Sequence, residues 1–498
     1  MTKLAEDPSV IGKWELLPYN SEVLAVHAAV LPKDKVLFFA GSGNSTVRFN
    51  SPDFGNTNKG IWCSVIWDYT VGAQFFFPNT LHTSDGKVID FFCGGESFLP
   101  DGRLIEAGGT EQYDPFHGRP DTLLFDLKTQ QWKATGNMAD GRWYPTLIAL
   151  GNGSILAASG LSATGGGNTT LESYSAKTGK WQTLQGSAPL PLYPHLFLLE
   201  SGKVFYSGGR MDSGDVQPAV IDITKTPFTM TGVTGLSDSG LRNQSASVLL
   251  PPAQDQKVMI IGGGPQDEND ATGKVDVINF KDAAPKYNPA APLHFPRQHL
   301  NAVLLPNRKI FVTGGSLKKE QGNVATLHSE TYDPPTNTWQ ITASSTVARM
   351  YHSIALLLPD GRVVASGGNP NRGTQVGWEP PDPNEELRLE IYSPPYMFHP
   401  GRPVIDAAPA KCKYGDVITI KSAQAGNIQS ASLIKNSVTT HSFNSSQRLV
   451  DLPIQSQKNG VIEAEVAKSS NLAPPGWYML TILDKERVPS AARWIQLQ

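Results

Sequence analysis

The sequence has only three cysteines, Cys63, Cys93 and Cys412, in 498 residues. Three scattered cysteines exclude a disulfide framework and a zinc knuckle, and their odd number leaves at least one thiol to be explained. The chain also lacks a basic block, and its formal net charge of −3 argues against nucleic acid as a partner. No apolar run approaches membrane-spanning length. Residues 1–7 are polar and acidic without a signal-peptide core, so either the protein is cytoplasmic or a leader has been omitted.

What the sequence does have is glycine (47) and proline (38) between short apolar runs, which predicts many strands and tight turns. An apolar strand, a turn, a second apolar strand and a small-residue or Gly-Gly pair recur along the chain. This pattern predicts an all-β protein with a seven-bladed β-propeller of the kelch type, because its period is about fifty residues. The seven copies cover residues 27–41, 92–109, 143–160, 193–209, 244–263, 298–315 and 351–368.

Tryptophan positions predict how the propeller closes. Several repeats end with an aromatic residue, a turn and a tryptophan, but the seventh has no tryptophan after Tyr392, and Trp14 lies alone before the first repeat. We therefore expect the strand around Trp14 to complete the last blade, which leaves no open edge. The expected domains are a tail of residues 1–10, the propeller over 11–400 and an immunoglobulin-like β-sandwich over 401–498, where short runs alternate.

The repeats place chemically active residues in the same phase. Cys93, Tyr144 and His352 each lie sixteen residues before the second member of a Gly pair, and Tyr193 and His299 hold this phase in the fourth and sixth repeats. Equivalent phase in a propeller means equivalent height and radius, so these residues should surround one end of the central channel. Cys93 and Tyr144 lie in consecutive blades, close enough for side-chain contact.

Tyr351 precedes His352 and adds a second phenol at the same mouth. Two phenols and two imidazoles form a mixed N,O set, which favours Cu(II) over zinc or calcium. The second imidazole must come from elsewhere. A loop of the C-terminal sandwich carries His441, which completes the set if this loop reaches down the channel; the alternatives are His27, His195 and His299.

A tyrosine in a propeller mouth usually serves packing, and a lone buried cysteine is usually inert. The joint occurrence of Cys, Tyr and Tyr-His in register favours a metal site instead. A second function remains open, a kelch-type interaction or glycan-binding protein with a vestigial site. The complete residue set argues against it, and the missing signal peptide argues for it. A zinc hydrolase is a third possibility, but the sequence places no cluster of carboxylates and histidines at this mouth, as such an enzyme would require.

Four segments resemble the metal-site motifs of the radical copper oxidases, the galactose oxidase and glyoxal oxidase family. They occur in the family's order: residues 91–95 (FFCGG), 141–144 (GRWY), 349–353 (RMYHS) and 439–441 (TTH). Residues 474–480 and 488–490 resemble the family's C-terminal domain. The resemblance begins near Gly12, which leaves no room for the N-terminal carbohydrate-binding domain of galactose oxidase.

The resemblance implies a role for each matched residue. Cys93 would form a thioether bond to the ring of Tyr144, which would bind copper and carry a radical. His352 and His441 would be equatorial ligands, and Tyr351 would be the axial phenolate and the base. One copper ion and the radical would each take one electron from a primary alcohol or small aldehyde, and O2 would leave as H2O2. We expect a secreted monomer from this resemblance.

One position departs from the family. Galactose oxidase has a tryptophan over the modified tyrosine just after the second Gly pair, where this chain has Ser162. No tryptophan lies between Trp181 and Trp339, so the middle blades offer no replacement. The sequence therefore does not fix the reduction potential of the radical. Glyoxal-oxidase-like members lack that tryptophan as well, which favours a small alcohol or aldehyde over galactose.

Overall fold

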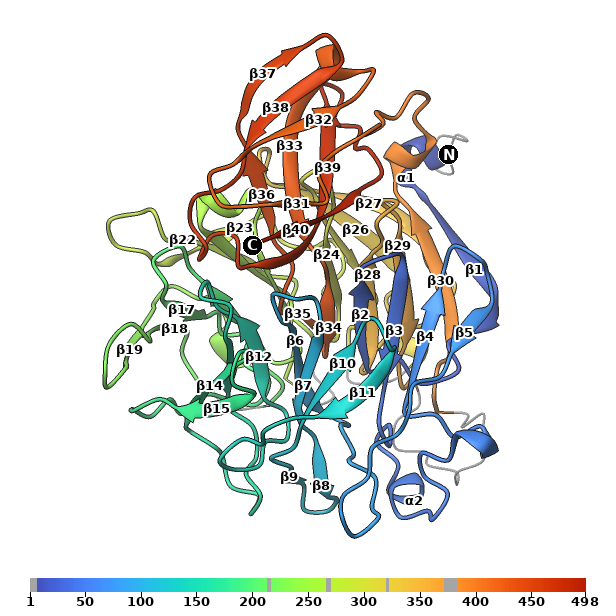
Figure 1. Cartoon of the computed structure of the whole chain (residues 1–498), viewed down its shortest axis with the longest axis vertical. Helices are drawn as coiled ribbons and strands as arrows, with labels where there is room; N and C mark the ends of the chain where they lie inside the picture. Colours follow the sequence, from blue (N-terminus) through green and yellow to red (C-terminus); the bar gives the residue numbers. More distant parts are fainter. Residues whose placement is uncertain (1–6, 213–215, 266–269, 319–321, 371–383) are drawn as a thin grey trace.

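The computed structural model describes residues 7–212, 216–265, 270–318, 322–370 and 384–498. This described part is built almost entirely of β-strands (Figure 1), and its helices have at most four residues. The all-β prediction is confirmed. None of the described helices has the length and apolar character needed to cross a membrane. The helical turns are α1 (Pro8–Ile11), α2 (Thr46–Phe49), η2 (Thr57–Lys59), η3 (Ser239–Leu241), η4 (Ala253–Asp255), η5 (Gly322–Val324), η6 (Pro395–Phe398) and η7 (Ala425–Asn427).

Seven sheets of four or more strands precede residue 394 in the described chain, and each takes its first two strands from one sequence repeat. The first four are β2–β5 (His27–Leu31, Lys35–Phe39, Ser64–Asp68, Gln74–Phe76), β6, β7, β10 and β11 (Gly94–Phe98, Leu104–Gly108, Thr122–Asp126, Gln131–Ala134), β12–β15 (Thr146–Ala149, Ile155–Ala158, Leu171–Ser175, Lys180–Thr183) and β16–β19 (Leu196–Leu198, Val204–Tyr206, Ala219–Asp222, Thr229–Gly232). The others are β20–β23 (Ala246–Leu249, Lys257–Ile261, Val275–Asn279, Tyr287–Ala290), β24–β27 (Asn301–Leu304, Ile310–Thr313, His328–Asp333, Thr338–Ser344) and β28–β30 with β1 (Ser353–Leu357, Val363–Gly367, Arg388–Ser393, Lys13–Asn20).

The last of these sheets is completed by the N-terminal strand. β1 pairs antiparallel with β30, and Trp14 lies opposite Tyr392 with their ring centroids 5.3 Å apart. Trp14 therefore takes the place of the tryptophan that the seventh repeat lacks, as the sequence predicts. The pairing gives β30 a partner along its outer side, which would otherwise be an exposed strand edge.

A buried arginine is repeated in four of the sheets. Each arginine forms an ion pair with a carboxylate on the third strand of its sheet, and its Nη1 donates to a backbone carbonyl at the Gly-pair position. Such paired, hydrogen-bonded charges hold the segment just before the first strand in a fixed place. The pairs are Arg142–Glu172 (2.8 Å), Arg242–Asp276, Arg297–Glu330 (2.8 Å) and Arg349–Glu390 (3.2 Å).

The C-terminal part forms two further sheets (red in Figure 1) that pack against each other as a sandwich. Alternating burial in Val417–Lys421 shows that one face of the smaller sheet is covered. The five-stranded sheet contains β31 (Lys411–Cys412), β40 (Arg493–Leu497), β39 (Gly476–Asp484), β33 (Ile428–Lys435) and β36 (Leu449–Leu452). The three-stranded sheet contains β32 (Val417–Lys421), β38 (Val461–Glu465) and β37 (Ile454–Lys458).

One hairpin of this C-terminal part leaves the sandwich. Its strands, β34 (Val438–Thr440) and β35 (Phe443–Asn444), extend the sheet of β2 to six strands, with β34 directly against β2. β34 also contacts β6 and β28, and β35 contacts β20 and β24, so the hairpin lies among the first strands of several sheets (Figure 1). The sequence-based expectation that this loop reaches into the channel is confirmed.

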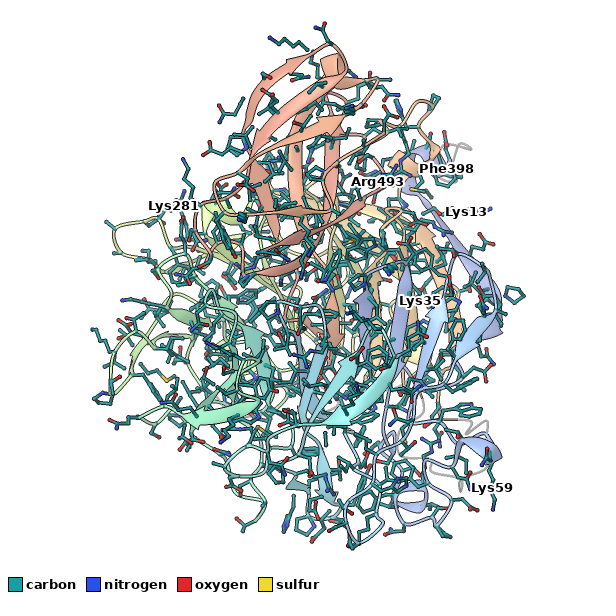
Figure 2. All side chains as sticks on the ribbon, viewed as in Figure 1. Lys13, Lys35, Lys59, Lys281, Phe398 and Arg493 are labelled. Atoms are coloured by element: carbon teal, nitrogen blue, oxygen red, sulfur yellow. The ribbon has the colours of Figure 1, made fainter. Side chains whose placement is uncertain are left out.

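The two ends of the assembly differ. The sandwich covers one end, and α2 and the small sheet of β8 (Thr110–Gln112) and β9 (His117–Gly118) lie at the other (Figure 1). First strands such as β2, β6 and β28 are fully buried. Charged side chains such as Lys59 and Lys281 are exposed and project from the periphery (Figure 2). The polar side chains buried next to these first strands include a candidate site.

Candidate metal centre

Five side chains predicted from the sequence converge at one buried point. One donor atom each of Cys93, His352 and His441 lies within 4.8 Å of the others, and the hydroxyl groups of Tyr144 and Tyr351 contact each other. All five residues are buried. They come from three different sheets and from the turn of the C-terminal hairpin, so only the folded chain brings them together.

The backbone explains why residues of equal repeat phase point to one place. Cys93, Tyr144, Tyr193, His299 and His352 all have left-handed φ angles, of 61°, 65°, 43°, 60° and 65°. This conformation costs a residue with a Cβ atom roughly 1–2 kcal/mol, and such residues concentrate at functional sites. Each lies just before the first strand of its sheet, so one repeated backbone turn presents each side chain to the mouth of the channel.

Backbone hydrogen bonds join these turns across neighbouring sheets. The amide of Tyr144 donates to the carbonyl of Cys93 at 2.8 Å, and the amide of Tyr193 donates to the carbonyl of Tyr144 at 2.8 Å. The three side chains are thus placed in a row by the main chain itself.

Both histidines have a partner for Nδ1. Nδ1 of His352 lies 2.5 Å from the side-chain oxygen of Asn369, and Nδ1 of His441 lies 2.5 Å from the hydroxyl of Thr440. An amide oxygen only accepts, and the Thr440 hydroxyl already donates to the carbonyl of Val26, so both Nδ1 atoms carry the proton. Nε2 then holds the lone pair, the tautomer that a metal-binding imidazole requires.

A stack of aromatic rings covers Tyr144. The ring of Trp143 lies on it at 3.7 Å with an interplanar angle of 8°, and Phe116 lies on Trp143 at 4.1 Å and 16°. The hydroxyl of Ser162, at the position of the expected tryptophan, faces Thr164 instead. The sequence did not predict that Trp143 would cover Tyr144. The available signal was its place directly before Tyr144, a residue of the repeat phase.

His27 lies behind Cys93 and is not one of the clustered donors. Its Nε2 accepts from the amide of Cys93 at 3.3 Å, and its Nδ1 donates to Glu96 at 3.0 Å. Glu106 lies opposite Glu96 on the neighbouring strand. Burial, together with the charge of Glu96, raises the pKa of Glu106 well above its ordinary value.

The two other candidate histidines also lie outside the cluster of donor atoms. His195 stacks on Phe443 at 4.4 Å, and its Nδ1 faces the hydroxyl of Ser247 at 2.9 Å. Burial lowers the pKa of His195 to about 3, so its ring is neutral. His299 shares the repeat phase, but it packs edge-on against Tyr351 at 5.4 Å.

The clustered groups fit one copper ion. Two imidazoles and two phenols provide nitrogen and oxygen donors, and the group of donor atoms contains no carboxylate among the residues that the structure describes. The hydrogen bonds that the two imidazoles donate to Asn369 and Thr440 fix the rings, which is the usual arrangement around metal-binding histidines.

Comparisons with known proteins agree with this geometry. The family model described as "Glyoxal oxidase N-terminus" matches residues 26–396, and the model described as "Galactose oxidase-like, Early set domain" matches residues 402–497. An aldehyde oxidase of Arabidopsis thaliana is 28% identical, over 98% of this chain and 84% of that protein. A galactose oxidase of Gibberella zeae is 25% identical, over 98% of this chain and 71% of that protein.

Among solved structures, a fungal alcohol oxidase in complex with copper matches with a TM-score of 0.80 and 25% identity, over 98% of this chain and 100% of that chain. Its match extends through both the seven sheets and the C-terminal sandwich. The first family model alone spans well over half of the sequence. The chain therefore belongs to the glyoxal oxidase and galactose oxidase family of copper radical oxidases, as its motifs predict.

Proposed function

We propose that this protein oxidises a primary alcohol or a small aldehyde to the aldehyde or the acid and reduces O2 to H2O2. The observation that carries the proposal is the buried convergence of Cys93, Tyr144, Tyr351, His352 and His441. The relatives support the substrate class, because they are named as oxidases of aldehydes, galactose and an alcohol.

In this proposal Nε2 of His352 and His441 and the phenolic oxygens of Tyr144 and Tyr351 hold one copper ion. Copper held by these four residues would supply one-electron redox chemistry for the reaction of the substrate with O2. The oxidised ring of Tyr144 would accept the other of the two electrons that the substrate releases. Tyr351 touches the hydroxyl of Tyr144 and takes the proton of the substrate hydroxyl. Two electrons and two protons thus move to O2, which leaves as H2O2, from the alcohol or from the hydrate that a small aldehyde forms with water.

Cys93 acts by modifying Tyr144. Formation of a thioether breaks the S–H bond of Cys93 and one C–H bond of the Tyr144 ring and forms a C–S bond, while O2 takes up the two electrons and two protons. The sulfur donates electron density to the ring and makes it easier to oxidise. The backbone hydrogen bond between the two residues holds the thiol and the ring in neighbouring positions.

Tight packing protects this chemistry from water. Tyr144, Tyr351 and Cys93 belong to one apolar cluster with Phe92, Trp143 and other buried side chains. A one-electron-oxidised phenol in such a dry site has few reaction partners, and electrostatic interactions inside it are stronger than in water.

Copper stoichiometry measured together with the visible spectrum and the intact mass tests the proposal. The copper-loaded protein under air should bind one copper per chain, lose two hydrogens in mass and yield a cross-linked peptide that contains Cys93 and Tyr144. It should then release H2O2 from primary alcohols or small aldehydes. Full-mass protein with separate Cys93 and Tyr144 peptides would refute the radical mechanism and favour a binding protein with a vestigial site.

A further inference from the structure

We propose that Tyr193 is a positioning residue that covers the second face of the Tyr144 ring and stabilises its oxidised form. The inference rests on the proposed function, because it assumes that Tyr144 is the residue that loses an electron. Tyr193 holds the same repeat phase as Cys93 and Tyr144, in the next sheet along the chain. The sequence identified this position without giving it a role.

The ring of Tyr193 packs on two members of the candidate centre at once. Its centroid lies 4.5 Å from that of Tyr144 at an interplanar angle of 29°, and 4.6 Å from that of His441 at 31°. Tyr193 is buried in the same apolar cluster as Cys93 and Tyr144. It is therefore part of the wall of the site.

The opposite face of Tyr144 is already occupied. The indole of Trp143 lies parallel to the Tyr144 ring at 3.7 Å, which is van der Waals contact between the two faces. No second ring fits on that face within 4.5 Å. Tyr193 must therefore lie against the other face, and Tyr144 is enclosed between an indole and a phenol.

Two hydrogen bonds fix Tyr193 in this position. Its amide donates to the carbonyl of Tyr144 at 2.8 Å, and its hydroxyl donates to the carbonyl of Gly94 at 2.5 Å. Gly94 directly follows Cys93, so Tyr193 connects the backbones of both residues of the proposed thioether.

The electronic consequence follows from the charge distribution of aromatic rings. The face of a phenol is electron-rich, and it attracts a group that becomes electron-poor when it loses an electron. The stacked contact exists in both forms of Tyr144, so only the extra attraction of the phenol face for the electron-poor, oxidised ring shifts the equilibrium between them. We expect loss of the contact to shift this equilibrium about twofold to tenfold toward the reduced form.

The test compares Tyr193→Met with Tyr193→Phe. Methionine keeps most of the volume but has no aromatic face, whereas phenylalanine keeps the face and loses only the hydroxyl. The readouts are the mass loss on copper loading under air, the midpoint potential of the oxidised form and the half-life of its radical absorption. We expect Tyr193→Met to raise the midpoint potential by the amount that corresponds to a change of about twofold to tenfold in the redox equilibrium. The half-life of the radical should shorten about twofold to tenfold, and Tyr193→Phe should stay near the wild type in both readouts.

Tyr287 provides a matched control. It is also a buried tyrosine whose hydroxyl donates to a backbone carbonyl, that of Ser207 at 2.8 Å, but it lies in the fifth sheet away from the centre. Tyr287→Met should leave the potential and the half-life of the radical unchanged. An equal shift in Tyr287→Met and Tyr193→Met would show a general effect of lost packing and overturn the proposal.

Pentafluorophenylalanine at position 193 keeps the proposal testable if Tyr193→Met does not fold. This residue has the shape of phenylalanine with the charge distribution of the ring reversed, so it should raise the potential relative to Tyr193→Phe. Equal potentials in these two variants would overturn the role of Tyr193 alone. A wild-type protein that gains no radical absorption and no mass loss would instead refute the proposed function.

Discussion

The Sγ atom of Cys93 lies 3.8 Å from Nε2 of His441, although 348 residues separate them in the sequence. One belongs to the second repeat and the other to the turn of a hairpin from the C-terminal domain. Their contact shows that the thiol and the second imidazole share one buried space. The thiol is therefore close enough to the proposed metal ligands for copper loading and the proposed modification of Tyr144 to be coupled.

Cys93→Ser should keep the fold and some copper binding but abolish the mass loss and most of the oxidase activity. Serine fits the space of cysteine, so the expected effect is on chemistry and much less on folding. Cys63→Ser and Cys412→Ser are matched controls, because both thiols are buried in other parts of the structure. Loss of two hydrogens in copper-loaded Cys93→Ser would show that another residue is modified.

His441→Ala should weaken copper binding by more than about 100-fold, since the loss of outer-shell partners alone costs 10–100-fold. The seven sheets should remain folded, because the imidazole lies in the turn of a hairpin whose strands still pair with β2. Competition with a chelator of known affinity measures the change. His195→Phe is the control and should bind copper like the wild type. Unchanged binding in His441→Ala would give the ligand role to His299 or His195.

Trp143→Leu should make the oxidised form of Tyr144 shorter-lived, because it removes the ring that lies 3.7 Å from the phenol. Trp143→Phe keeps a stacked ring and should lie between this variant and the wild type. The expected change in half-life is about twofold to tenfold, the value of one aromatic stack. The decay of the radical absorption after oxidation measures it. Equal half-lives in all three proteins would show that the stack has a purely structural role.

Lys435 predicts a pH dependence of stability. It is fully buried, its Nζ faces the carbonyls of Pro474 and Pro475 at 3.3 Å, and burial lowers its pKa to about 7. The unfolded chain holds this proton up to about pH 10, so the free energy of unfolding should rise by up to about 1.4 kcal/mol per pH unit above pH 7.

Lys435→Met should lose this rise, because methionine carries no proton in either state. Denaturant titrations of both proteins between about pH 7 and pH 9 measure the difference, which removes the contribution of every other titrating group. Lys281→Met, at an exposed position, is the control and should follow the wild type. Parallel curves for Lys435→Met and the wild type would contradict a lowered pKa at Lys435.

Much of the candidate centre could be predicted because the repeat fixes backbone geometry. The count of sixteen residues to a Gly pair selected Cys93, Tyr144 and His352, and the structure gives each of them the same left-handed turn. A constant spacing within a repeat carries three-dimensional information, since each copy folds on the same frame. The tryptophan that closes the last sheet, Trp14, was predicted from the same regularity.

The contacts that the repeat does not encode were harder to predict. The depth to which the hairpin reaches depends on its pairing with β2, between segments more than 400 residues apart. The face of Tyr144 that Trp143 covers depends on the left-handed angle at Tyr144, which no residue preference reveals. The partners of the imidazole rings, Asn369 and Thr440, are ordinary polar residues in sequence and gain a role only through their positions.

The pairing of β2 with β34 has a consequence for the order in which the protein matures. β2 leaves the ribosome early, and about four hundred more residues must be added before β34 emerges. The first sheet therefore cannot be completed until nearly the whole chain has been synthesised. β1 waits in the same way for β30. A nascent chain that ends between residues 352 and 441 therefore contains the thiol and the two phenols without the second imidazole. This order would disfavour premature acquisition of copper by an incomplete polypeptide.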